Sequence, residues 1–266
     1  MLTFKEIINT YKNTKKSTLT VYLILRVLVI LCMIREICMA EWNNAFLCLL
    51  SLILFTIPFN LQEKFKIKLP SVLEIIILCF IFSAEILGEI NNFYGTIPYW
   101  DTILHTLNGF LAAGVGFSLI DLLNKNSKKI KLSPIFVAIV AFCFSMTIGV
   151  LWEFFEFGSD NILRTDMQKD KIVSDISTVE LDPEKRNKVV KIENIKYTEI
   201  YHEDEKGNIV KTLVPDGYLD IGIRDTMKDL IVNFIGALCF SIVGYLYISN
   251  RDKYSFVKNF VPEKNK

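Results

Sequence analysis

Ionisable and amide side chains recur near one end of four long apolar stretches of this sequence. Within each stretch they are three, four, seven or eight residues apart, a spacing that places them on one face of a helix. They are Glu85 and Glu89 at the end of the third apolar stretch, Asp101, His105 and Asn108 at the start of the fourth, Glu153, Glu156 and Asp160 at the end of the fifth, and Asp225, Asp229 and Asn233 at the start of the sixth. Four polar stripes at one depth predict a single outward-facing pocket that the four helices share.

So many carboxylates cannot all stay ionised together in a low-dielectric pocket, so some must be protonated, paired or neutralised by a cation. Two or three carboxylates with one imidazole suit a divalent metal ion, because oxygen ligands favour Mg²⁺ or Mn²⁺ and a histidine admits Zn²⁺ or Fe²⁺. The candidate metal ligands are His105, Glu153, Glu156 and Asp229, and Asp101 joins them as a candidate catalytic residue. The other candidates for the pocket lining are Glu85, Glu89, Asn108, Trp152, Asp160, Asp225 and Asn233.

Three kinds of function remain open at this point. A bound metal ion with an open coordination position activates water against a phosphate or acyl group, which predicts a hydrolase or transferase acting on envelope lipid or lipid-linked substrates. Without a metal, His105 beside a carboxylate serves as a general base, or the cluster relays protons in an ion-coupled transporter. In the third case the acids only hydrogen-bond to their neighbours and set the helix register, and the function lies in binding a partner.

Long apolar helices must position these side chains. Of the 266 residues, 52% are hydrophobic and 22% are charged, and the mean hydropathy is +0.36. A helix needs about 20 apolar residues to cross the hydrocarbon core of a bilayer. The stretches of that kind are Thr18–Met39, Asn43–Phe59, Ser71–Gly88, Ile103–Leu123, Pro134–Phe157 and Leu230–Ser249. The sequence therefore predicts an all-α integral membrane protein, a bundle of six transmembrane helices, with the first five in residues 18–157 and the sixth in 227–249. The net charge of +1 gives no electrostatic reason to expect nucleic acid as a partner.

Lysine and arginine residues gather in alternate segments that flank these helices. Positively charged segments of this length stay in the cytoplasm. They contain Lys5, Lys12, Lys15 and Lys16, then Lys64, Lys66 and Lys68, then Lys125, Lys128, Lys129 and Lys131, and finally Arg251, Lys253, Lys258, Lys264 and Lys266. The N-terminal segment, residues 1–17, and the C-terminal tail, residues 250–266, are therefore both predicted to be cytoplasmic.

Residues 158–226 form a polar insertion between the fifth and sixth helices, on the outer side of the membrane in this orientation. Two runs rich in β-branched and aromatic residues, Lys188–His202 and Ile209–Val214, flank a turn at Lys206-Gly207-Asn208. They predict a β-hairpin over about 188–214. The alternation of apolar and polar residues slips near Asn194, which indicates a bulge. The insertion is either a lid over the pocket or a solvent-exposed segment that contacts no site.

Four short motifs in this chain resemble the YjdF-like family of bacterial multi-pass inner-membrane proteins. They are Trp100–His105, Leu151–Phe157, Thr165–Gln168, and Asp225–Leu230 with Asn233 and Gly236-Ala237. The similarity covers most of 71–169 and 220–249 and implies a protein of the bacterial plasma membrane. It implies no activity, because the function of the family is not established. In the usual pattern the Met-Gln and Asp-Thr-Met elements lie close together, whereas here residues 171–217 separate them.

A second similarity concerns only the order of a few residues. An acid four residues before a histidine, then a glutamate, then an aspartate four residues before an asparagine is similar to the layout of VanZ-like proteins, which are linked to glycopeptide resistance. This similarity points toward envelope lipids or peptidoglycan precursors as the substrate class.

Overall fold

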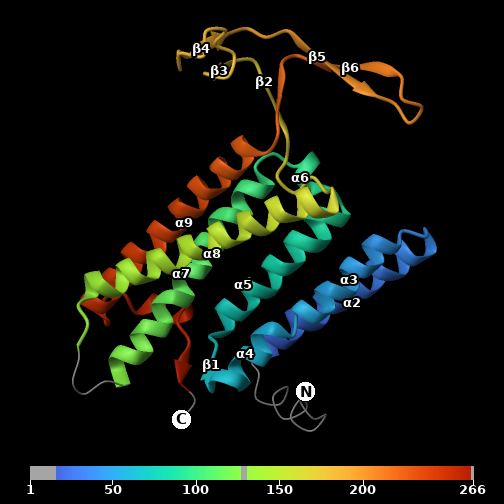
Figure 1. Cartoon of the computed structure of the whole chain (residues 1–266). Coiled ribbons are helices and arrows are strands. Elements are labelled where there is room, and N and C mark those ends of the chain that lie inside the picture. The colour runs from blue at the N-terminus through green and yellow to red at the C-terminus, as the bar shows by residue number, and fades with distance from the viewer. Residues whose placement is uncertain (1–15, 127–130, 265–266) are drawn as a thin grey trace. The chain divides into compact units, whose positions relative to one another are not determined.

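The computed structural model describes residues 16–126 and 131–264, and most of the described chain is helical (Figure 1). Six helical segments in this part are long and apolar enough to cross a membrane, as predicted. They are Lys16–Cys38, Trp42–Lys64, Ser71–Ile90, Trp100–Asn124, Pro134–Leu163 and Ile223–Ser249. Lys5, Lys12, Lys15, Lys128, Lys129 and Lys266, which entered the orientation argument, lie outside the described residues.

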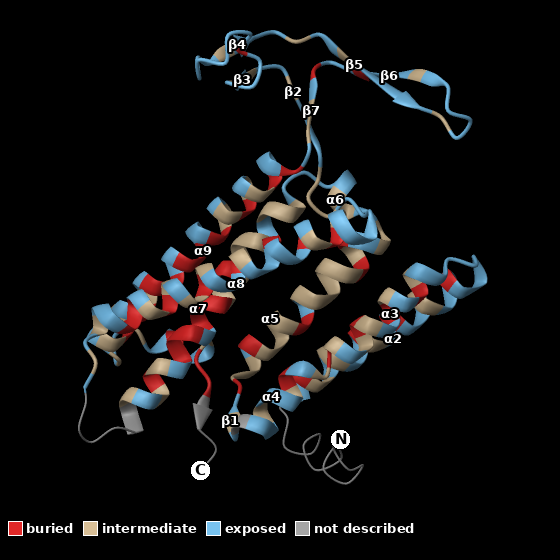
Figure 2. Ribbon diagram, viewed as in Figure 1, coloured by how far each residue is buried: buried red, intermediate tan, exposed pale blue. Residues whose placement is uncertain are grey.

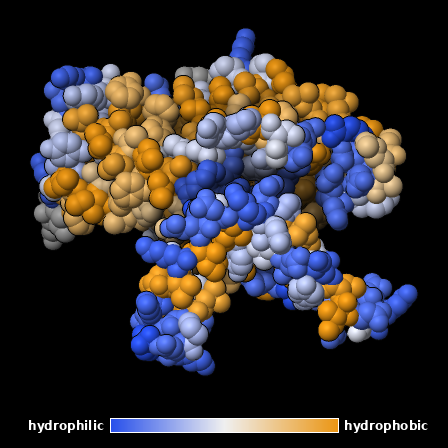
Figure 3. Space-filling model, turned by 90° about the horizontal axis from the view of Figure 1, so that it is seen from above, coloured by the Kyte–Doolittle hydropathy of each residue, from blue (hydrophilic) through white to orange (hydrophobic). Residues whose placement is uncertain are grey.

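The surface of these helices suits a lipid environment. Large apolar side chains such as Leu31, Phe46 and Ile139 are more than half exposed. Hydrophobic patches are visible over much of the space-filling view (Figure 3). Soluble monomers rarely expose apolar surface on this scale, so these faces are the ones expected to contact lipid.

The first span is α2 (Lys16–Cys38), and the second is divided into α3 (Trp42–Leu54) and α4 (Ile57–Phe65). The division follows from Pro58 near the start of α4. Proline has no backbone N–H, so it cannot bond to the carbonyl four residues earlier, that of Leu54, where α3 ends. This break explains why the second apolar stretch looks short in the sequence.

The third and fourth spans are joined by a short connection. The third is α5 (Ser71–Ile81), which continues into η1 (Phe82–Ile90), a π-helical segment. The one-turn helix α6 (Phe93–Thr96) then leads to α7 (Trp100–Asn126), the fourth span. The fifth and sixth spans are α8 (Pro134–Leu163) and α9 (Ile223–Ser249).

The chain divides into two compact units, and each is described here by itself. The first comprises the chain up to Gly149 together with the chain from Val232 onward, and the second comprises Val150–Ile231. The first unit has two apolar cores, shown by the buried positions in Figure 2. The first core includes Val29 of α2, Phe55 directly after α3, and Leu78 of α5. The second core is formed by residues of α7, α8 and α9.

In the second core, α7 and α9 approach closely through glycines. A Cβ atom at Gly109 would lie 2.2 Å from the carbonyl oxygen of Asn233, and one at Gly236 would lie 2.0 Å from that of Thr106. Farther along, the ring centroids of Phe117 and Tyr247 are 6.2 Å apart. Contacts advance together along both helices, so α7 and α9 run parallel.

The segment after α9 returns into the first unit instead of remaining a free tail. It contains the short 3₁₀ helix η2 (Ser255–Asn259), and Val257 and Val261 are buried in the second core. The ring of Phe260 meets that of Phe110 in an edge-to-face contact, with centroids 5.6 Å apart. Beyond it, β8 (Glu263–Lys264) pairs antiparallel with β1 (Ile67–Lys68).

The second unit holds the insertion, which is built from three antiparallel strand pairs. β2 (Lys171–Val173) pairs with β7 (Tyr218–Asp220), β3 (Ile176–Thr178) with β4 (Val190–Ile192), and β5 (Tyr197–Glu203) with β6 (Ile209–Pro215). The β5–β6 pair confirms the predicted hairpin with its turn at Lys206–Asn208. The β2–β7 pair is its stem, since it joins the two ends of the insertion.

The first predicted strand of the hairpin, Lys188–His202, is wrong as a single strand. The chain breaks at Asn194, whose φ of +57° lies in the left-handed region and whose N–H donates to Asp175 Oδ1 at 3.0 Å. Residues before the break pair with β3 and residues after it pair with β6. The slip in the apolar pattern therefore marks a change of partner, where the sequence indicated a bulge.

Candidate functional site

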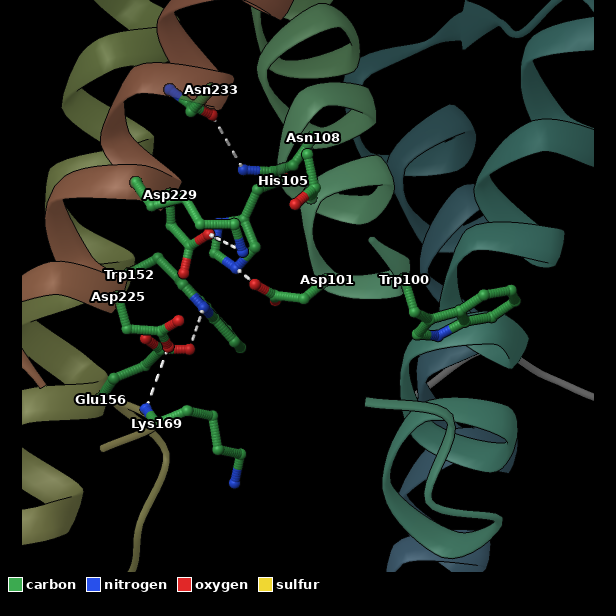
Figure 4. Close-up of polar contacts among 12 residues, drawn as sticks. Trp100, Asp101, His105, Asn108, Trp152, Glu156, Lys169, Asp225, Asp229 and Asn233 are labelled. Atoms are coloured by element: carbon green, nitrogen blue, oxygen red, sulfur yellow. Dashed lines mark hydrogen bonds and ion pairs between the residues drawn. The ribbon is translucent and has the colours of Figure 1, made fainter. Parts of the chain in front are cut away.

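Asp101 and His105 form an ion pair one turn apart at the start of α7. His105 Nε2 lies 3.3 Å from Asp101 Oδ1, and the side chains are 14% and 25% exposed (Figure 4). Asp101 lies in the first turn of the helix, where the helix dipole stabilises a negative charge. A carboxylate beside a ring nitrogen orients the imidazole and places an oxygen donor next to a nitrogen donor.

Asn108 and Asn233 lie in the contact between α7 and α9. Asn108 Nδ2 donates to Asn233 Oδ1 at 3.4 Å (Figure 4), and Asn233 is only 1% exposed. A Cβ atom at Gly149 of α8 would lie 2.6 Å from Asn233 Nδ2, so α8 also presses against this amide. In addition, Ser145 Oγ of α8 donates to the carbonyl of Gly109 at 2.7 Å. These contacts fix the register of three helices, a structural role that was one of the alternatives left open by the sequence.

Glu85 and Glu89 lie in η1. Glu85 is half-buried and Glu89 is exposed. Beside them, the indole N–H of Trp100 donates to the carbonyl of Ser83 at 3.3 Å, which ties the start of α7 to η1. The indole of Trp100 points away from His105 in Figure 4.

In the second unit, the end of α8 that follows Gly149 carries four predicted site residues, which are Trp152, Glu153, Glu156 and Asp160. Glu153 and Glu156 are buried, at 5% and 7% exposure, whereas Trp152 is nearly half exposed. Trp152 Nε1 donates to Glu156 Oε1 at 2.8 Å (Figure 4). The i, i+4 spacing of this pair on one helix face explains the bond, and it occupies one of the oxygens of Glu156.

Asp160 holds the loop that leaves α8. Its Oδ1 accepts from Thr165 Oγ1 at 2.8 Å and from the N–H of Met167 at 2.7 Å, and its Oδ2 accepts from the N–H of Gln168 at 2.8 Å. A carboxylate that accepts two backbone N–H bonds caps a turn that would otherwise leave those donors unsatisfied. The carboxylate of Asp160 therefore binds the loop of its own chain at Thr165, Met167 and Gln168.

Asp225, in the first turn of α9, holds the continuation of that loop. Its Oδ2 accepts from the N–H of Lys169 at 2.9 Å (Figure 4), and its Oδ1 lies 3.4 Å from Lys171 Nζ. Gln168 Nε2 donates to Thr226 Oγ1. The elements Thr165–Gln168 and Asp225–Met227 are therefore adjacent in space, although the insertion separates them in sequence, because the β2–β7 stem brings its two ends together.

The stem carries an acidic environment outside the spans. Burial raises the pKa of the Asp170 carboxyl, and the nearby charges of Asp166, Asp160 and Asp220 raise it further. Asp182, farther along the insertion, has a lowered pKa, because the backbone N–H groups of Lys188, Arg186 and Glu184 donate to its carboxylate.

Asp229 is 2% exposed and lies one turn before Asn233 on the same face of α9. The ammonium of Lys228 lies 3.7 Å from its Oδ1. Asp225 is therefore engaged in the stem, whereas Asn233 lies in the contact between α7 and α9, so the residues of the polar stripe predicted on α9 have different partners.

Two buried ionic groups of the first unit were not among the predicted site residues. Glu36 is 3% exposed, and its carboxylate accepts from Arg35 Nε at 2.6 Å and from Asn44 Nδ2 at 3.0 Å. Asp121, 0% exposed, accepts from Arg251 Nη2 at 2.5 Å. The signal for both was present, since an acid inside or at the end of an apolar span needs a partner.

The family described as "Predicted membrane protein (DUF2238)" matches residues 18–250, most of the chain. The chain belongs to this family. DUF2238 is the YjdF family, so the resemblance carried by the four motifs is confirmed. Membership shows a membrane protein, in agreement with the six candidate spans.

One relative of this DUF2238 chain is a protein of Thermotoga maritima described as "Uncharacterized protein". It is 31% identical over 106 residues, which are 40% of this chain and 53% of that protein. The match thus spans about half the length of the relative. No solved structure matches the chain.

Proposed function

We propose that this protein is a metal-dependent hydrolase or transferase of the bacterial plasma membrane, in which Asp101, His105 and Asp229 hold a divalent cation. One imidazole with two carboxylates is a donor set that suits Zn²⁺, Mn²⁺ or Fe²⁺. This set takes Asp101 in place of Glu153 and Glu156, because Asp101 is already paired with the imidazole.

The register between α7 and α9 is the observation that carries the proposal. The two helices run parallel and touch where Gly109 meets Asn233. His105 precedes Gly109 by four residues, and Asp229 precedes Asn233 by four. One turn back from the same contact on each of two parallel helices therefore leads to His105 on one and Asp229 on the other.

The chemistry follows from the donors. A divalent ion with an open coordination position lowers the pKa of bound water and polarises a phosphoryl or acyl oxygen. The carboxylate of Asp101 lies beside the imidazole of His105, so these two residues supply neighbouring oxygen and nitrogen ligands to the ion. Lys228, half exposed beside Asp229, supplies a positive charge for an anionic substrate group. The substrate class that fits a site within membrane-spanning helices is an amphiphile, such as an envelope lipid or a lipid-linked precursor.

The orientation that belongs to this proposal has both chain ends in the cytoplasm and the insertion outside. Among the described residues, Lys64 ends the second span and Lys66 and Lys68 follow it, and Arg251, Lys253 and Lys258 follow the sixth span, which supports this orientation. All six native cysteines lie in spans. We expect a membrane-impermeant thiol reagent to label Asn208→Cys, in the hairpin turn, on intact cells, and to label Lys253→Cys only after lysis. The reverse pattern would contradict the orientation.

Elemental analysis of the detergent-purified protein tests the metal site. We expect near-stoichiometric metal in the wild type, and less than about a tenth of it in His105→Ala and Asp229→Asn, because loss of one ligand of three weakens binding strongly. His202→Ala is the matched control, since His202 is the other histidine of the chain and bonds to Thr212 in the hairpin.

Thermal stability separates loss of metal from loss of fold. The proposal expects both ligand variants to purify as folded protein. A wild type that stays metal-free after metal is added back, or ligand variants that keep their metal, would contradict it.

A further inference from the structure

We propose that the groove between α5 and α7 binds the hydrocarbon chain of the substrate, so that the site at Asp101 and His105 acts on a membrane amphiphile. This inference rests on the proposed function and names the substrate class of the same site. The groove lies wholly within the first unit and has a volume of about 340 Å³. Its lining is apolar apart from Ser83, and it includes Cys79 of α5 and Trp100, Ile103, Leu104 and Leu107 of α7.

The groove exists because its two walls belong to different cores. On one wall, α5 contributes Leu78 to the core that it shares with α2 and α3. On the other, α7 contributes Ala113 and Phe117 to the core that it shares with α8 and α9. Neither core fills the space between α5 and α7, so an apolar surface remains open there.

The two stripes on α7 explain how a chain and a headgroup fit together. Trp100, Leu104 and Leu107 line the groove, and the polar residues Asp101, His105 and Asn108 each follow one of them by a single position. One residue is about 100° of rotation on an α-helix. The polar stripe therefore lies directly beside the apolar one along the same helix.

The ends of the groove have different chemistry. Trp100 stands at the start of α7, next to Asp101, and its indole N–H is bound to the carbonyl of Ser83. Tryptophan at such a position is typical of the level of the lipid headgroups. At the other end, one turn beyond Leu107, Phe110 meets Phe260 of the returning C-terminal segment. The short helix η2 of that segment also contacts α5.

The occupant to which these features point is a single hydrocarbon chain. The groove is formed by two membrane-spanning segments, so the molecules available to it are lipids, and no charged side chain lines it. A hydrocarbon chain that enters this groove leaves an equally apolar environment of lipid tails, so the favourable free energy of binding comes from close packing and not from the hydrophobic effect. The contacts of the headgroup with Asp101 and His105 then decide which lipid is bound. An acyl chain of a phospholipid and an isoprenyl chain of a lipid-linked precursor share this chemistry.

Filling the groove tests the proposal. Cys79→Trp puts an indole into the groove, and Cys143→Trp is the matched control, because Cys143 is also exposed but lies on α8 outside the groove. Native mass spectrometry with added phosphatidylglycerol or undecaprenyl phosphate then measures lipid retention. We expect Cys79→Trp to retain about tenfold less of one of the two lipids than the wild type, and Cys143→Trp to retain it fully. The lipid that is lost identifies the source of the chain.

Equal retention of both lipids by Cys79→Trp and the wild type would overturn the inference. Metal content measured in the same samples distinguishes this result from failure of the proposed function, because filling the groove leaves Asp101 and His105 unchanged. If Cys79→Trp is unstable, Ile103→Phe fills the same groove from the α7 side and decides the question in the same way.

Discussion

Replacement of Asp121 by alanine is expected to lower the melting temperature of the detergent-solubilised protein by roughly 10 °C. The carboxylate is 0% exposed and accepts two hydrogen bonds from Arg251, at 2.5 Å and 3.3 Å. The guanidinium carbon also lies 4.9 Å from the ring centroid of Tyr247. Removal of one partner leaves the other charge partly buried without compensation, which costs about 3–5 kcal/mol.

A double replacement shows whether this effect comes from the pair. In Asp121→Leu with Arg251→Met both charges are absent, and replacement of both partners by apolar residues is often nearly neutral. We therefore expect most of the lost stability to return in the double variant. If the double variant is as unstable as the sum of the single variants, the two residues act independently and the account of the pair is wrong.

Replacement of Asp160 by alanine is expected to open the base of the insertion without unfolding the helices. Three hydrogen bonds from Thr165, Met167 and Gln168 end on this carboxylate. If their loss costs about 3 kcal/mol locally, the open form of the loop becomes about a hundredfold more populated. Limited proteolysis should then cut near residues 164–169 about a hundredfold faster, because cleavage follows the population of the open form.

Asp182→Ala is the matched control for this change. Asp182 also accepts three backbone N–H bonds, from Glu184, Arg186 and Lys188, but it lies inside the insertion, away from the stem. It should shift cleavage to its own loop and leave 164–169 protected. Unchanged proteolysis at 164–169 in Asp160→Ala would show that the β2–β7 pairing alone holds the base.

The six spans could be predicted from the sequence because hydropathy over about 20 residues depends on composition alone. Helical spacing likewise predicted that Asp101 and His105 share a face, and they form an ion pair. The hairpin turn at Lys206–Asn208 was visible for a similar reason, since turn residues act locally. These features need no knowledge of which segments meet in space.

The features that escaped prediction depend on long-range pairing. Asp160 and Asp225 were predicted to line the pocket, yet their carboxylates accept hydrogen bonds from residues 165–169. These contacts arise because the β2–β7 stem brings the chain back to the start of α9. The split at Asn194 depends in the same way on β3 as an alternative partner. The sequence predicted residues 250–266 to be a tail, because the two buried residues Val257 and Val261 form an apolar pattern too short to indicate a core segment.

Pulsed electron paramagnetic resonance of the Mn²⁺-loaded protein would test the central claim most directly. The chain has two histidines, His105 and His202, so a coordinated imidazole nitrogen can be assigned with two variants. The account predicts ¹⁴N modulation from one imidazole in the wild type and in His202→Ala, and its loss in His105→Ala. A spectrum without nitrogen modulation, or modulation that persists in His105→Ala, would contradict a metal site at His105.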